Sequence, residues 1–217
     1  METQEITYQP GKVARIQLNR PRYLNAQSWR LRNELDLAFE AAVADANVGA
    51  IVLSGMGGNF SAGHDIGTPE DRAYRKEIGH LRTDPKGIYD DLKEINVANT
   101  LRWRNVPKPT IGMVEGYCIF GGWMIAAAMD VLFAAQDAMF LPGQTQYFSV
   151  PWDIGAKRAK EILFEHRFLS ARECFDDGFV NRVFDSQDLE EQTLAYAGRV
   201  ADNYLQNPMV VETSKRT

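Results

Sequence analysis

Hydrophobic positions along the chain follow two different spacings. Residues 13–18 alternate apolar and polar side chains, which is typical of a half-buried strand. Continuous apolar runs at 49–54, 110–114 and 131–135 have the length of strands and predict strands in the middle of a sheet. A last short strand is predicted at 180–184.

Between these runs, apolar residues recur three or four positions apart, which predicts helices. The first follows Ser28 or Asn25 as its N-cap, and others follow Pro151, Ser170 and Asp188. Ser170 and Glu173 form a capping-box pattern. Residues 138–152 are rich in aromatics and poor in charge, so we expect a loop there. Strands alternating with helices indicate one α/β domain over residues 1–217.

Residues 66–105 differ from the rest of the chain because they are strongly charged. Long segments without regular structure inside a domain are usually functional or disordered. We therefore expect a lid or a mobile surface excursion, of which 88–101 packs back through an approximate helical spacing.

Composition narrows the class of protein. The 217 residues are 45% hydrophobic and 24% charged, as in an ordinary soluble domain. A formal net charge of -5 argues against nucleic-acid binding, which relies on clustered Lys and Arg. No apolar run is long enough to span a bilayer and no signal peptide is evident, so we expect a cytoplasmic protein with no membrane partner. Two cysteines and three scattered histidines give no metal-ligand spacing, so no metal is expected.

Two glycine-rich stretches are the candidates for chemistry. At 114–129 an apolar approach leads to Gly121 and Gly122 and then to a run of small apolar residues, which predicts a helix with a bare N-terminus. Such a terminus stabilises negative charge, although a glycine pair equally permits tight packing of strand and helix. The loop at 55–65 carries four more glycines.

Taken in order, the stretches Phe60-Ser-Ala-Gly-His-Asp-Ile and Pro107-Lys-Pro-Thr-Ile-Gly-Met-Val-Glu-Gly-Tyr-Cys-Ile-Phe-Gly-Gly resemble the two oxyanion-hole segments of the crotonase (enoyl-CoA hydratase/isomerase) superfamily. Further likeness lies at Leu18-Asn-Arg-Pro, Asp130-Val-Leu-Phe-Ala-Ala and Arg167-Phe-Leu-Ser-Ala-Arg-Glu-Cys, so that it covers most of the chain.

The resemblance implies a crotonase-like spiral of ββα units, assembled as a homotrimer or homohexamer. It also implies an acyl-CoA thioester as substrate, with coenzyme A a part of that substrate and no permanently bound cofactor. The backbone N–H groups of His64 and Gly121 correspond to the donors that polarise the thioester carbonyl. The resemblance further implies contacts to CoA from Arg20, Arg22, Ser61, Ala62, His64, Asp65 and Ile66. For the two arginines, simple exposure to solvent is the alternative.

The chain departs from the hydratase pattern at the two catalytic glutamates. Met124 and Gln144 occupy their positions, and neither side chain exchanges protons in the required range. Phe120 replaces a glycine that hydratases commonly carry. The predicted acyl pocket is lined by Phe120, Met124, Gln144, Tyr147, Phe148 and Trp152. Ordinary core packing is the alternative for the aromatic residues.

Asp153 is the candidate acid or base, because apolar neighbours would raise its pKa and some superfamily members place an aspartate nearby. The alternative is a helix N-terminal residue favoured by the helix dipole. The His64 imidazole, which titrates near neutrality when unperturbed, is a second candidate, and a role in fixing the loop or lining the CoA channel is its alternative.

Three functions follow from these residues. The first is an enzyme of enoyl-CoA hydratase/isomerase type that stabilises a thioester enolate without the glutamate pair. The second is isomerisation or hydrolysis through Asp153. The third is a non-catalytic CoA-binding or assembly subunit, consistent with Met124, Gln144 and the expectation that the usual C-terminal helices after Thr217 are absent or truncated.

Overall fold

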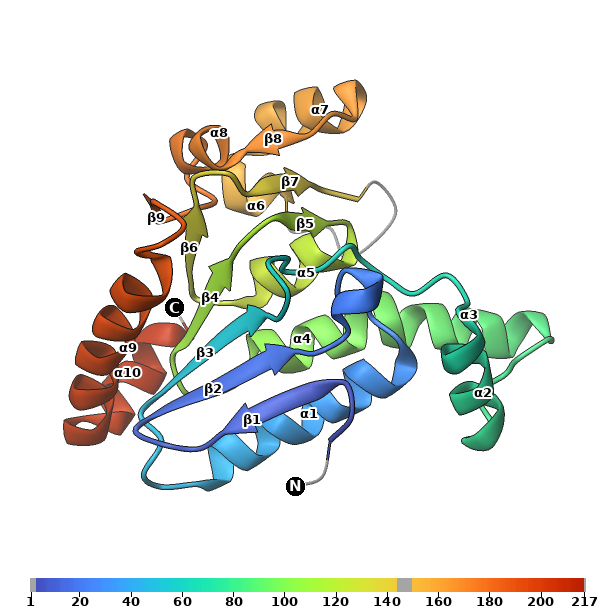
Figure 1. Ribbon diagram of the computed structural model, residues 1–217, viewed down its shortest axis with the longest axis horizontal. Helices are drawn as coiled ribbons and strands as arrows, with labels where there is room; N and C mark the ends of the chain where they lie inside the picture. Colours follow the sequence, from blue (N-terminus) through green and yellow to red (C-terminus); the bar gives the residue numbers. More distant parts are fainter. Residues whose placement is uncertain (1–2, 144–149, 217) are drawn as a thin grey trace.

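The structure is a computed structural model that describes residues 3–143 and 150–216. Its main sheet has the strand order β1-β2-β3-β4-β6-β9, in which β1 runs antiparallel to β2 and the other neighbours are parallel (Figure 1). These strands are β1 (Ile6–Gln9), β2 (Val13–Leu18), β3 (Ala50–Gly55), β4 (Thr110–Val114), β6 (Val131–Ala135) and β9 (Arg182–Phe184). The strands predicted at 13–18, 49–54, 110–114, 131–135 and 180–184 are confirmed.

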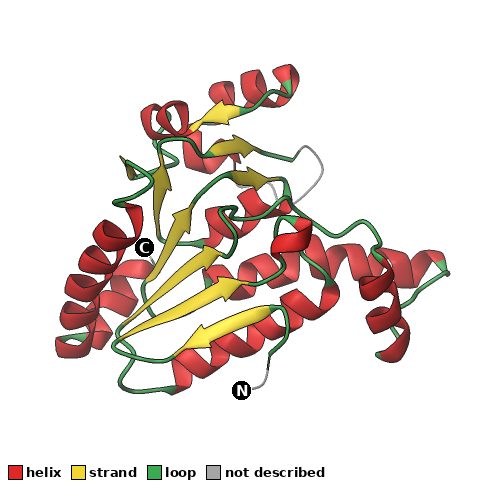
Figure 2. Ribbon diagram, in the orientation of Figure 1, coloured by secondary structure: helices red, strands yellow, loops and turns green. Residues whose placement is uncertain are grey.

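Both faces of the main sheet are covered, which explains the continuous apolar runs. Along β3, Ile51 and Leu53 join the larger hydrophobic core, which also holds the apolar face of α1 (Trp29–Ala44). The intervening Ala50 and Val52 pack with α9 (Leu189–Gln206) on the opposite face. Figure 2 shows the strands between these layers of helices.

A second, smaller sheet lies next to the start of α5. It consists of β5 (Tyr117–Ile119), β7 (Met139–Leu141) and β8 (Leu169–Ser170), in the order β5-β7-β8. β5 lies directly before α5 (Gly121–Ala128), so the predicted strand, glycine pair and helix are confirmed. The loop expected at 138–152 is wrong in two places, since it contains β7 and most of α6 (Val150–Ile154). Buried Phe140 pairs with Cys118 and Leu169, so β7 packs as a strand.

The charged segment after the first glycine loop is largely helical. It contains α2 (Pro69–Glu77), α3 (Pro85–Lys93), a π-helical turn (Glu94–Ala98) and α4 (Asn99–Arg104). In Figure 1, α2 and α3 extend to the right, whereas α4 lies near the centre. Thr68 and Asp84 cap α2 and α3 through their side chains, and a proline follows each cap. Motion of this segment as a lid stays a prediction.

The C-terminal half has more helices than the pattern predicted. The helix expected after Pro151 is divided at Gly155, whose φ of +83° interrupts the helix between α6 and α7 (Ala156–Glu165). Ser170 and Glu173 form the predicted capping box of α8 (Ala171–Asp176). A further helix, α10 (Pro208–Lys215), begins at a proline in its first position. Among the described residues, no helix is long and apolar enough to cross a membrane.

Lys108, between two prolines, closes the C-terminus of α1. Its ammonium group is buried and donates to the carbonyl oxygens of Ala42 at 2.9 Å and Asp45 at 2.6 Å. These carbonyls belong to the last turn of the helix, where no intrahelical donor is available. A positive charge there also complements the helix dipole.

We expect Lys108→Met to lower the free energy of unfolding by about 2 kcal/mol, because it removes two charge-assisted hydrogen bonds to buried carbonyls. Chemical denaturation measures this loss. Lys12→Met is the matched control, since Lys12 forms an exposed ion pair with Asp202 and its loss should cost under about 1 kcal/mol. Equal losses in the two variants would contradict the role given to Lys108.

Candidate active site

The first glycine-rich segment lies between the residues before α1 and strand β5. On one side, Gln27 N–H donates to Gly63 O at 2.7 Å and Asp65 N–H donates to Gln27 O at 3.0 Å. On the other side, Ser61 N–H donates to Tyr117 O at 2.8 Å and Ile119 N–H donates to Ser61 O at 2.9 Å. Residues 61–65 are therefore held like a short strand on both edges.

Two glycines allow this segment to touch the beginning of α5. A Cβ on Gly122 would stand 2.5 Å from Ser61 O, and one on Gly63 would stand 3.0 Å from Ile119 O. Gly63 also has a φ of +99°, which side chains rarely adopt. Gly122 is therefore needed for close packing of the two segments, which was the alternative to an anion site, because a side chain there would push the segments apart.

Gly121 lies at the contact between the two predicted donor segments. A Cβ at this position would stand 3.1 Å from Cε1 of the His64 ring and 3.1 Å from both amide atoms of Gln27. Gly121 is the first residue of α5, so its N–H has no acceptor within the helix. The structure thus brings His64 and Gly121 together, as predicted.

Gln27 is a residue of this site that the sequence analysis missed. Its side chain is 3% exposed and its amide nitrogen donates to Ser61 Oγ at 3.2 Å. A single polar residue before a helix cap carries no pattern of its own. Its proximity to Gly121 becomes evident only once the two segments are folded together.

Phe120 precedes α5 with a φ of 46° and a ψ of -103°, a conformation that side chains disfavour. Its N–H donates to Leu141 O at 2.7 Å, and its ring stacks on His166 with centroids 6.0 Å apart. Glycine would adopt the same backbone conformation without this strain. The phenyl ring is held against His166, at the entrance of the helix.

We expect Phe120→Gly to be more stable to denaturation than Phe120→Ala by about 1 to 2 kcal/mol, because glycine adopts this backbone without strain. Phe164 in α7 serves as the control, since its side chain is 82% exposed and there alanine should exceed glycine by about 1 kcal/mol. The same order of glycine and alanine at both positions would show that the backbone at Phe120 is unstrained.

The His64 imidazole does not titrate near neutrality. Burial, together with the nearby positive charge of Arg32, lowers the pKa of His64 from its ordinary value of 6.5 to about 3. The expectation of a neutral-pH acid or base at His64 is therefore wrong, because a protonated ring would lose its hydration next to another cation. The ring is neutral at physiological pH.

Unfolding exposes this ring, and its pKa then returns to about 6.5. Below that pH the unfolded chain binds a proton that the folded chain refuses until about pH 3, so His64 makes stability fall as pH is lowered through this window. At pH 5 the cost relative to pH 7 is up to about 2 kcal/mol. Denaturation at both pH values should show a smaller loss for His64→Gln than for the wild type, and equal losses would contradict a His64 ring that stays neutral in the folded chain.

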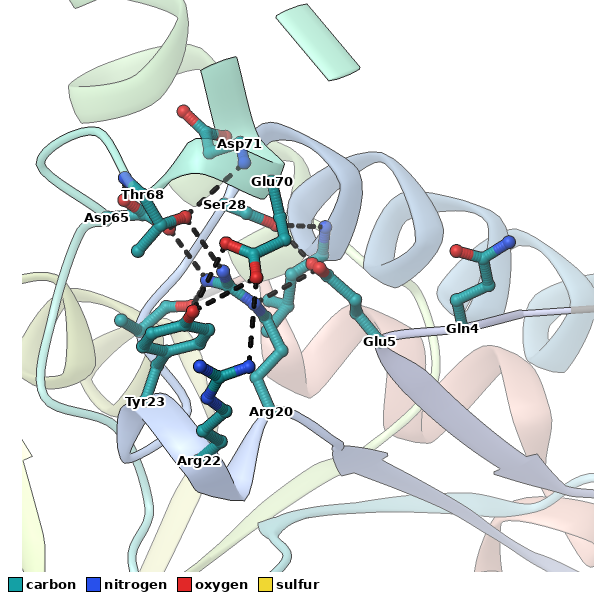
Figure 3. A network of polar contacts seen from close by, with 12 residues as sticks. Gln4, Glu5, Arg20, Arg22, Tyr23, Ser28, Asp65, Thr68, Glu70 and Asp71 are labelled. Carbon is teal, nitrogen blue, oxygen red and sulfur yellow. Dashed lines mark hydrogen bonds and ion pairs between the residues drawn. The ribbon is translucent and has the colours of Figure 1, made fainter. Parts of the chain in front are cut away.

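Arg20, predicted to contact CoA phosphates, is instead the centre of a buried ion-pair network (Figure 3). Its side chain is 4% exposed and pairs with Asp65 at 2.9 Å and Glu5 at 3.1 Å. It also donates to Ala26 O and to Thr68 Oγ1. A guanidinium committed to these acceptors is not available to a phosphate, so this prediction is wrong for Arg20.

Asp65 uses the same network to fix the chain directly after His64. Its carboxylate accepts from the N–H groups of Gly67 and Thr68 and from the Thr68 hydroxyl. Burial favours the neutral acid, but the hydrogen bonds from Thr68, Gly67 and Arg20 outweigh it and lower the pKa of Asp65. Asp65 is therefore a structural carboxylate, charged at neutral pH.

Arg22 has a different environment from Arg20. Its side chain is 80% exposed, and its only described ion pair, with Glu70, has a length of 3.9 Å. Among the other residues assigned to CoA, Ser61 is buried, Ala62 is half-buried and Ile66 is fully exposed. Arg22 is thus the arginine of this loop that remains accessible to a ligand.

The predicted acyl-pocket residues divide into three groups. Met124 is buried on α5 yet belongs to neither hydrophobic cluster, and Phe120 lies at the start of the same helix. Trp152 is 80% exposed, so it is not a pocket wall within this chain. Its place on the short helix α6 turns it to solvent. Gln144, Tyr147 and Phe148 lie outside the described residues.

Asp153 lies away from the two predicted donors. It borders a cavity of about 180 Å³ together with Ala126, Asp130 and Asn181. Those residues surround the C-terminal end of α5, whereas Gly121 is its first residue. The two ends of α5 are roughly 10 Å apart along the helix axis, given a rise of about 1.5 Å per residue. The structure does not bring Asp153 together with His64 and Gly121.

Comparison with known proteins identifies the family of the chain. Residues 9–213 match the family model described as enoyl-CoA hydratase/isomerase. The chain belongs to that family. The EchA13 protein of Mycobacterium tuberculosis is 32% identical over 213 residues, which cover 90% of this chain and 67% of that protein.

Solved structures of family members give the same fold. The probable enoyl-CoA hydratase of Mycobacterium thermoresistibile is 37% identical, with a TM-score of 0.85 over 98% of this chain and 85% of that chain. The enoyl-CoA hydratase/isomerase of Xanthobacter autotrophicus Py2 is 31% identical, with a TM-score of 0.85 over 99% and 78%. The predicted crotonase-like α/β fold and membership of this enzyme family are confirmed.

Proposed function

We propose that this family member binds an acyl-CoA thioester and stabilises its enolate through the backbone N–H groups of His64 and Gly121. The observation that carries the proposal is the contact between the His64 segment and the bare N-terminus of α5, across Gly121. Two donors fixed before reaction need no reorganisation as negative charge develops on the oxygen. Each donor of this type lowers a barrier by roughly 3 to 4 kcal/mol.

The surroundings of the two donors favour the same chemistry. The dipole of α5 adds positive potential where the enolate oxygen would lie. The His64 ring is neutral and so does not act as an acid at neutral pH. The backbone N–H of His64 is the group that would donate to the oxyanion. Arg22 and the main chain of 61–66 are the groups we assign to the CoA moiety, with Arg22 accessible to a phosphate. Arg20 stabilises the loop after His64 through its contacts with Asp65 and Thr68.

The proton transfer differs from that of a hydratase with two glutamates. Met124 is buried one turn into α5, where a glutamate would otherwise hold the attacking water. A thioether neither takes up nor releases a proton. Asp153, on α6, borders a cavity at the C-terminal end of α5, whereas an acyl α-carbon held by Gly121 would lie at the N-terminal end of that helix. We therefore rank enolate stabilisation above a reaction that depends on Asp153.

We also propose self-association, as a homotrimer or a pair of trimers. Trp152 and Phe164 are 80% and 82% exposed, and both belong to the α6–α7 region beyond the small sheet. Large apolar side chains gathered on one region favour burial against another protein surface. Such an interface would also give Trp152 a protein environment that the single chain does not provide.

The binding step is tested by thermal denaturation with butyryl-CoA, crotonyl-CoA and free CoA. A thioester at about 100 times its dissociation constant should stabilise the folded chain by about 2.7 kcal/mol and raise the melting temperature by several degrees. Free CoA should raise it less, because it lacks the carbonyl that the two donors bind. The absence of any shift with both thioesters would refute the proposal.

The chemical step is tested by turnover of enoyl-, 3-hydroxyacyl- and 3-ketoacyl-CoA substrates. We expect Asp153→Asn to retain wild-type turnover and the same thioester-induced shift in melting temperature, since Asp153 lies at the far end of α5. A loss of turnover with unchanged binding would favour the isomerase or hydrolase alternative. Thioester binding without turnover of any substrate would favour a CoA-binding subunit.

A further inference from the structure

Arg32 is a buried cation that the proposed chemistry does not use. It lies on α1, is 2% exposed, and ranks among the largest fully enclosed side chains of the chain. Arginine is rarely buried without a paired acid, because removing a guanidinium from water is costly. Burial lowers the pKa of Arg32 to about 9, so that the side chain remains charged at neutral pH.

The hydrogen-bonding capacity of Arg32 is unfilled. Neither Nε nor Nη1 has a hydrogen-bond partner, and within the described part of the chain Arg32 forms no ion pair. Its guanidinium lies 4.8 Å from the centroid of the Trp29 ring, a cation–π contact that leaves the N–H groups free to donate. A charged donor left in this state is a large cost unless an acceptor arrives.

The acids around Arg32 are committed to other groups. Asp71 accepts from Trp29 N–H at 2.7 Å, and burial raises its pKa. Glu94 pairs with Arg102 at 2.6 Å. Asp36 accepts from Asn99, Arg102 and Trp103. These acids therefore attract the Arg32 charge from a distance, but no described carboxylate forms an ion pair with it.

Other side-chain nitrogen atoms without hydrogen-bond partners also lie near Trp29. Arg75 lies 5.4 Å from the Trp29 ring and His80 packs on it at 4.7 Å, and Arg75 Nε and His80 Nδ1 also lack hydrogen-bond partners. Four of the six buried side-chain atoms without partners, within the described residues, thus belong to this cluster. Asp91 is the acid of this cluster and lies 3.1 Å from Arg75 and 3.5 Å from His80, so Arg32 is the arginine of the cluster that lacks a carboxylate partner among the described residues. A charged donor in this state favours binding of an anion.

Arg32 is also close to the predicted oxyanion donors. Gln27 pairs with His64 in a parallel bridge, and Arg32 follows five residues later, in the first turn of α1, which begins at Trp29. The charge of Arg32 is felt at His64, where it contributes to the lowered pKa. The acyl end of a thioester whose carbonyl lies at His64 would have to extend toward α1 to meet this guanidinium.

We propose that Arg32 binds a second carboxylate on the acyl group, so that the substrate class is the CoA monothioester of a short dicarboxylic acid. This inference rests on the proposed function, since it takes the thioester carbonyl to lie at His64 and Gly121. The substrate carboxylate supplies the acceptors that Nε and Nη1 lack and neutralises the buried charge. A neutral acyl group leaves the guanidinium unpaired, so the site rejects it in proportion to that cost.

Isothermal titration with acyl-CoA pairs of equal chain length tests the proposal. Succinyl-CoA and glutaryl-CoA carry the terminal carboxylate, and butyryl-CoA and pentanoyl-CoA are their neutral counterparts. We expect the wild type to bind the better dicarboxylic thioester at least about tenfold more tightly than its neutral counterpart. This comparison needs no variant and is independent of whether any substitution at Arg32 folds.

Arg32→Met should abolish the preference by weakening the dicarboxylic thioester about tenfold or more, with the neutral thioester bound as well as before or better. Arg30→Met is the matched control, because Arg30 lies on the same helix over the Tyr74 ring and its loss should leave the preference intact. Circular dichroism confirms that both variants are folded.

The outcomes separate this inference from the function on which it rests. Tight binding of neutral thioesters with no preference for the dicarboxylic ones would overturn the role of Arg32 and leave the proposed function standing. Binding of none of the four thioesters would overturn both. A preference that survives Arg32→Met would also overturn the inference, because another group would then hold the carboxylate.

Discussion

The candidate site depends on one close approach of backbone to backbone. Ser61 O lies where a Cβ on Gly122 would collide with it, and the turn at Gly63 lies against Ile119 O. Hydrogen bonds on both edges of residues 61–65 hold this approach in place. Because of it, the start of α5 and the His64 segment meet across Gly121, although more than fifty positions separate them along the chain.

Two buried arginines lie near this contact, and their surroundings differ. Arg20 is paired with Asp65 and Glu5, so its charge stabilises the loop that follows His64 (Figure 3). Arg32 has no such described pair, although both guanidiniums are almost fully enclosed. A paired buried cation is structural, whereas an unpaired one needs an acceptor from elsewhere. The contrast between the two arginines is the reason to associate Arg32 with a ligand.

The strands and the main helices could be predicted from the sequence because their physical causes are local. A covered sheet imposes continuous apolar runs such as 110–114, and Ser170 with Glu173 caps a helix within four residues. The segment β7 was missed because three residues give no period. The helical spacing expected at 88–101 falls on α3, the π-helical turn and α4. The helix α2 was missed because it is mostly polar, and polar helices lack the apolar stripe on which prediction depends.

At the site, the sequence predicted which backbone segments meet but not which side chains surround them. The glycine pattern predicted the meeting of His64 and Gly121, since glycine marks close approach. It could not distinguish Arg20 from Arg22, because burial depends on distant partners such as Glu5 and Asp65. The roles of Gln27 and Arg32 likewise arise only after α1 packs beside the glycine segment.

The central claim is that two backbone donors polarise a thioester carbonyl, and a crystal structure with a bound acyl-CoA tests it most directly. The account predicts that the thioester oxygen lies about 2.7 to 3.1 Å from both His64 N and Gly121 N. A well-ordered thioester whose oxygen contacts neither nitrogen would contradict the account.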